Sequence, residues 1–88
     1  MPELVFTRDT LRQRDLEAFS RAYRAALPEN PGRIEERGAT VRAAAAAGWF
    51  GEALTAAAVD DLPPRIVDAL AAAVNTLYEE ATTPDPKA

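Results

Sequence analysis

A run of five alanines, Ala43–Ala47, with Gly48 directly after it, constrains the fold of this chain more than any other feature. Alanine has the highest helix propensity of all residues, and its small side chain lets a neighbouring helix approach closely. Glycine readily takes the left-handed conformation that ends many helices. The run therefore predicts a closely packed helix over about residues 37–48, with the bulky pair Trp49 and Phe50 at its end.

The hydrophobic core of such a chain must be thin. Of the 88 residues, 20 are alanine and only 22 are apolar and larger than alanine. A chain of this length buries about 60 to 65% of its unfolded surface, which leaves little stability unless the helices pack closely. We expect a single helical domain over residues 1–82, followed by a loose polar tail over residues 83–88.

Apolar residues at spacings of three and four predict two more helices. The first covers about residues 11–27, with Thr10 as its candidate cap. The other covers about residues 63–81 and begins with prolines, which the first helical turn tolerates. Their apolar stripes are Leu16, Phe19, Tyr23, Ala26 and Leu27 in the first helix, and Ile66, Val67, Leu70, Val74, Leu77, Tyr78 and Ala81 in the last. The expected fold class is a small all-α bundle of three main helices.

Two segments lie outside these helices. Residues 3–7 alternate weakly between apolar and polar side chains, which predicts a short extended N-terminal arm. A lone extended segment either packs on its own domain or pairs with another chain, and we expect packing on its own domain. Residues 51–62 contain few large apolar side chains, so we expect a single weak turn of helix there.

Catalytic chemistry is not expected from this composition. The chain has no Cys and no His, so the usual general base, the thiol nucleophile and the common zinc ligands are missing. Its one serine, Ser20, lies inside a predicted helix and has no histidine to activate it. The acidic pairs 35–36, 60–61 and 79–80 are interpreted as solvated groups or as charges at helix N-termini. We therefore expect a protein that is not an enzyme and has no cofactor or metal.

Charge is distributed unevenly along the chain. The net charge is −4, and residues 1–42 carry eight Arg against seven acids, whereas Arg65 and Lys87 are the only cations after residue 42. Arg14, Arg21 and Arg24 share the side of the first helix that faces away from its apolar stripe. This face is either solvated, or it contacts an acidic protein or nucleic acid, and the net negative charge argues against nucleic acid.

Two aromatic residues are further candidate contacts. Trp49 and Phe50 follow a helix end, a position typical of core residues, yet a thin core has limited volume for both. Exposed aromatic residues are typical anchors of protein interfaces. We therefore expect at least one of them to face a partner. No apolar run approaches the roughly 18 residues of a membrane span, so we expect a cytoplasmic protein without membrane contact.

Three short motifs, read in order, resemble small proteins of tailed bacteriophages and prophages. The motifs are Arg-Asp-Leu-Glu at 14–17, Ala-Gly-Trp at 47–49 and Asp-Asp-Leu-Pro-Pro at 60–64. The resemblance covers about residues 7–80. In this order the motifs are similar to those of tail assembly chaperone-like proteins, which are encoded near the tape-measure gene.

The resemblance implies a non-enzymatic helper that keeps the long, apolar tape-measure protein soluble during tail assembly. From their apolar character, we place the contact with this client on Phe6, Trp49, Phe50 and the outer edge of the last helix, and self-association would use the same surface. The protein would act in the cytoplasm of an infected or lysogenic host, and a place in the virion stays open. Two alternatives are a structural connector or virion subunit, and a small helical regulator that binds DNA through its arginine face.

Overall fold

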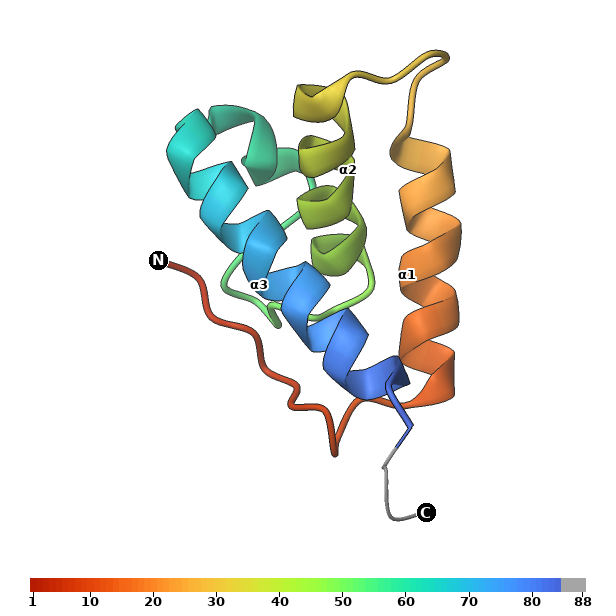
Figure 1. Ribbon diagram of the computed structural model, residues 1–88. Coiled ribbons are helices and arrows are strands. Elements are labelled where there is room, and N and C mark those ends of the chain that lie inside the picture. Colours follow the sequence, from red (N-terminus) through yellow and green to blue (C-terminus); the bar gives the residue numbers. More distant parts are fainter. Residues whose placement is uncertain (85–88) are drawn as a thin grey trace.

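Three α-helices and one short 3-10 helix make up the all-α bundle of the computed structural model, which describes residues 1–84 (Figure 1). In chain order these are α1 (Gln13–Ala26), α2 (Arg33–Ala46), η1 (Ala57–Asp61) and α3 (Pro64–Thr82). The all-α fold class and the number of main helices are confirmed. Most of the tail expected at 83–88 lies outside the described residues.

The alanine run makes α2 the central helix of the bundle. Ala39, Ala43 and Ala44 are buried, and α1 and α3 both pack against α2. Small side chains on α2 allow these two helices to approach it closely, because little volume separates the backbones. The prediction that this helix packs at short range is confirmed.

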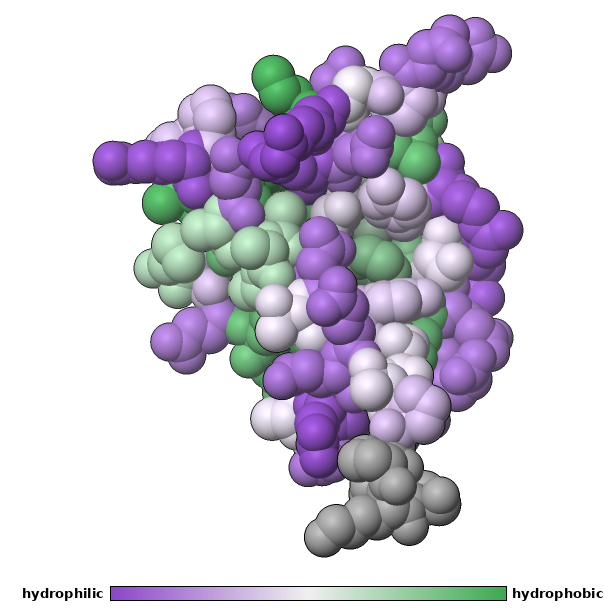
Figure 2. All heavy atoms as spheres, viewed as in Figure 1, coloured by the Kyte–Doolittle hydropathy of each residue, from purple (hydrophilic) through white to green (hydrophobic). Residues whose placement is uncertain are grey.

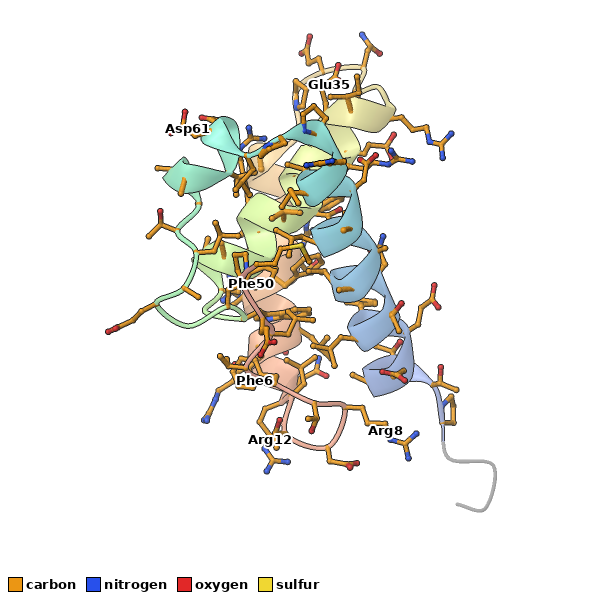
Figure 3. All side chains as sticks on the ribbon, turned by 90° about the vertical axis from the view of Figure 1, so that its left-hand side faces the viewer. Phe6, Arg8, Arg12, Glu35, Phe50 and Asp61 are labelled. Carbon is orange, nitrogen blue, oxygen red and sulfur yellow. The ribbon has the colours of Figure 1, made fainter. Side chains whose placement is uncertain are left out.

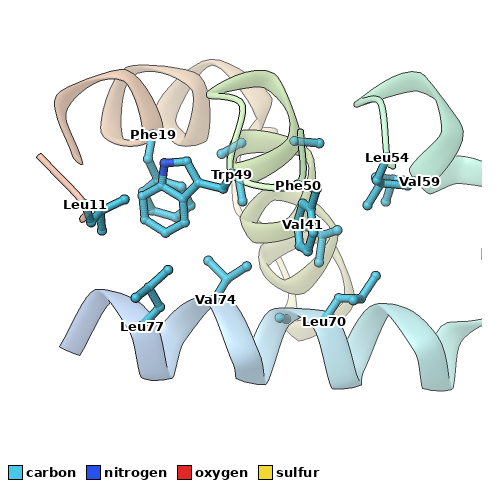
Figure 4. Packing of buried hydrophobic residues seen from close by; sticks show 14 residues of the cluster. Leu11, Phe19, Val41, Trp49, Phe50, Leu54, Val59, Leu70, Val74 and Leu77 are labelled. Carbon is cyan, nitrogen blue, oxygen red and sulfur yellow. The ribbon is translucent and has the colours of Figure 1, made fainter. Parts of the chain in front are cut away.

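Trp49 fills the space between α1 and α3 at the end of α2 (Figure 4). Its ring stacks on Phe19 of α1, with the ring centroids 4.8 Å apart, and Phe19 also contacts Tyr78 of α3 at 5.7 Å. The indole Nε1–H donates a hydrogen bond of 3.3 Å to the backbone carbonyl of Asp15, so the one polar atom of the ring has a partner. One residue of the loop after α2 thus joins both outer helices to the core.

The helix starts differ from those expected from the sequence. Thr10 does not cap α1, because its side chain bonds to Thr7 in the preceding turn. Arg12 holds the cap position instead, and its backbone N–H donates to the Asp15 carboxylate at 2.9 Å. The second helix begins at Arg33, several residues before the expected start at 37, since Gly32 leads into it in an extended conformation and two acids favour its first turn.

The N-terminal arm packs on its own domain, as expected. The backbone N–H of Val5 donates to the carbonyl of Trp49 at 2.9 Å, and Leu4 and Phe6 lie half-buried against the core. The weak turn expected within residues 51–62 is also confirmed, since η1 occupies part of this stretch and buries Val59.

Gly48 ends α2 in the left-handed region, at a φ of +83°. A Cβ built at this position meets no other atom within 4 Å, so an added side chain would cost only backbone energy. Gly48→Ala should therefore lower the free energy of unfolding by about 1 to 2 kcal/mol. Gly48→Asn should cost less, because asparagine tolerates this conformation. Urea unfolding followed by circular dichroism checks both, and equal losses would contradict the backbone explanation.

Candidate protein-binding site

The two aromatic residues expected to face a partner lie inside the core. Trp49 is 0% exposed and Phe50 is 1% exposed. The expectation that at least one of them contacts a partner is therefore wrong for the folded domain. The space between α1 and α3 explains the difference. It provides room for these rings, whereas the many small residues in the sequence suggested a core too thin to hold both.

Phe6 was predicted to share a contact surface with the outer edge of the last helix, and its position agrees with this in part. It is half-buried against the core, and its remaining surface lines a shallow hollow between the arm and α3. Ala72, Ala73 and Thr76 form the α3 side of this hollow. The structure thus brings Phe6 beside the outer edge of the last helix. In Figure 2, apolar side chains gather on the left-hand side of the molecule, where the N-terminal arm runs in Figure 1.

Arg14, Arg21 and Arg24 are exposed on the outer face of α1, so their common face is confirmed. Within residues 1–84, none of the three forms an ion pair. Arg24 instead folds back along its own helix and donates to the Ser20 carbonyl at 3.4 Å. A role for this face in binding stays a prediction.

The most exposed large apolar residue inside a helix did not stand out in the sequence. Ile34 is 82% exposed in the first turn of α2. By helical spacing it continues the row of Gly38 and Val41, which are buried. Because the second helix was expected to begin at residue 37, Ile34 lay outside every predicted helix. The early start at Arg33 turns it into the uncovered end of the core-facing row.

An apolar hollow lies beside Ile34, where α2, η1 and the start of α3 meet. Its apolar lining consists of Ile34, Gly38, Val59, Leu62, Pro64 and Val67. Val59 is buried, and Leu62 and Val67 are half-buried, so the floor belongs to the hydrophobic core. In Figure 3, Glu35 and Asp61 lie at this upper end of the molecule, and Phe6 and Arg8 lie at the opposite end.

Two ion pairs between neighbouring elements border this hollow. Arg37 of α2 contacts Asp68 of α3 at 2.8 Å, and Arg42 of α2 pairs with Asp60 of η1. Gly38 leaves room for the Arg42 guanidinium, since a Cβ at this position would lie 2.9 Å from its Nη1. Exposed pairs of this kind add little stability. They do give the apolar floor a polar rim, which is the usual anatomy of a protein interface.

The chemistry of this site is that of apolar contact. Across residues 1–84, the structure contains no group of three or more acidic side chains placed to hold a metal ion. None of the helices in this range is both long and apolar enough to span a bilayer. What the hollow offers is a small apolar floor, a protruding isoleucine and charges of both signs around them.

The fold and this surface together define a class, a small all-α domain with an uncovered apolar end. No protein family, curated protein or solved structure matches the chain.

Proposed function

We propose that this protein is a non-enzymatic assembly chaperone that binds an apolar helical segment of another protein at the hollow beside Ile34. One observation carries the proposal: a large aliphatic side chain, 82% exposed, stands next to an apolar floor that the domain itself leaves uncovered. A single exposed apolar residue needs no partner, but Ile34 continues into an apolar hollow, and contiguous apolar patches of this kind are typical of interaction surfaces. A helix that lays its apolar face across the hollow covers both.

The binding energy expected from this surface is moderate. Covering Ile34 alone contributes about 1.5 to 3 kcal/mol. Covering the apolar floor of the hollow adds to this gain, and the ordering of a client segment offsets part of the total. Moderate affinity suits a helper that must release its client during assembly. The net charge of −4 keeps a complex with an apolar client soluble, because like-charged complexes repel one another.

The identity that we propose for the client is based on the sequence resemblance. The three motifs at 14–17, 47–49 and 60–64 resemble tail assembly chaperone-like proteins of phages. We propose the tape-measure protein, or another apolar helical tail protein, as the client. Such a client presents long apolar helices before the tail tube covers them, and the hollow beside Ile34 fits that chemistry.

The test is co-expression with the tape-measure protein of the same genome. The wild-type chain should keep this client in the soluble fraction and co-purify with it. Ile34→Asp should weaken binding at least tenfold, because it places a charge where the client's apolar side chain packs. The thermal midpoint should stay nearly unchanged, since Ile34 is exposed in the free protein. Isothermal titration with a client fragment measures the affinity.

Ala53→Asp is the matched control. Ala53 is exposed in the loop before η1 and does not line the hollow, so the same change in charge should leave client binding unaltered. Equal binding by the wild type and by Ile34→Asp would contradict the proposed site. Failure of the wild type to bind any tail protein, together with stable presence in purified particles, would favour a structural subunit instead.

A further inference from the structure

The outer face of α3 is the second surface that the domain leaves uncovered. It carries six exposed residues at spacings of 4, 3, 1, 3 and 4, namely Arg65, Ala69, Ala72, Ala73, Thr76 and Glu80. These spacings place all six on one side of the helix. The bulkier Leu4, Phe6 and Leu77 continue this surface into the hollow beside the arm. In Figure 1, α3 runs along the front of the bundle.

The spacing of the residues along this face is symmetric about its middle. A point midway between Ala72 and Ala73 relates Ala69 to Thr76, and it relates the cation Arg65 to the anion Glu80. A second copy of the same helix, laid antiparallel about a twofold axis at this point, therefore meets a complementary sequence. Each copy places its Arg65 opposite the Glu80 of the other. The two charge pairs lie about 22 Å apart along the helix axis, one at each end.

The charges at the two ends are available for such pairing. Within the described part of the chain, neither Arg65 nor Glu80 takes part in an ion pair, although three other pairs form. Glu80 lines the hollow beside the arm together with Arg8 of the same chain. Within residues 1–84 no ion pair joins these two side chains, so the Glu80 carboxylate can receive the cation of a second copy. Between the ends, only alanine and threonine separate the two helices, so their backbones approach closely.

We propose that the protein forms a twofold-symmetric dimer through antiparallel α3 helices, with Arg65 of each copy paired to Glu80 of the other. Twofold dimers use the same patch on both copies, which this self-complementary face supplies. The dimer leaves the hollow beside Ile34 free, because none of the six residues lines it. It presents two such hollows, and two linked sites hold a long client more strongly than one. The dimer does not depend on the identity of that client.

The test is sedimentation equilibrium of the purified chain and of charge-reversed variants. The wild type should show a monomer–dimer equilibrium. Arg65→Glu should raise the dissociation constant about tenfold, since two attractive pairs become two repulsive ones. Arg65→Glu combined with Glu80→Arg should restore the wild-type value, because the pairs re-form with their signs exchanged. Circular dichroism checks that each variant is folded, as expected for exposed positions.

Arg33→Glu is the control, because it makes the same change in charge at an exposed position in the first turn of α2, away from this face. It should leave the dissociation constant unchanged. A strictly monomeric wild type would overturn the proposal. So would a dimer indifferent to Arg65→Glu, a loss that the double variant does not restore, or an equal loss in Arg33→Glu.

Discussion

Trp49→Ala is expected to lower the free energy of unfolding by about 3 to 5 kcal/mol, which is the usual cost of truncating a buried tryptophan. The ring is 0% exposed, stacks on Phe19 and donates to the Asp15 carbonyl, so its removal takes contacts from α1 and leaves a cavity beside α3. Small domains have total stabilities of only about 5 to 15 kcal/mol. We therefore expect a large loss of helical circular dichroism near room temperature.

Trp49→Phe tests whether any aromatic ring at this position is sufficient or whether the full indole ring is needed. It keeps an aromatic ring near Phe19 and loses the indole hydrogen bond, so a smaller loss of about 1 to 2 kcal/mol is expected. Urea denaturation of both variants, followed at 222 nm, measures the two losses. If Trp49→Ala unfolds at the wild-type midpoint, the ring does not hold the bundle together.

Ala44→Leu is the second change with a large expected effect. Ala44 is 0% exposed on α2, in the helix against which both outer helices pack. Three additional carbon atoms cannot fit there unless a neighbouring helix moves, and overpacking of this kind costs about 1 to 3 kcal/mol. Leucine and alanine have similar helix propensities, so any loss reports on packing between helices.

Ala46→Leu provides the matched control for this prediction. Ala46 lies two residues further along the same helix and is exposed, so the same substitution meets no neighbouring helix. Its effect should stay within about 0.5 kcal/mol. Thermal unfolding of the pair under identical conditions tests the difference. Equal stability of the two variants would mean that α2 does not need alanine for close packing.

The helices of this fold were predictable because their signals are local. The alanine run and Gly48 marked the body and the end of α2, and Pro64 does stand at the start of α3. Capping was less predictable, since Thr10 and Asp15 both stand near the start of α1 and only the backbone path decides which of them bonds to it.

The candidate site was only partly predictable. Phe6 and the outer edge of α3 do lie side by side, but the hollow beside Ile34 did not emerge from the sequence. Its lining comes from α2, η1 and α3, and local spacing says nothing about which parts of distant segments leave a gap where they meet. The arginine face of α1 was predictable, because one helix by itself determines it.

By itself, the sequence determined where the chain is helical and where its helices end, because propensity and the left-handed end at Gly48 act over a few neighbouring residues. Only the tertiary structure decided that Trp49 and Phe50 are enclosed while Ile34 is exposed. An aromatic residue after a helix end has the same local pattern in a core and at an interface. The volume left between α1 and α3 determines which of the two it becomes, and that volume exists only once the helices have packed.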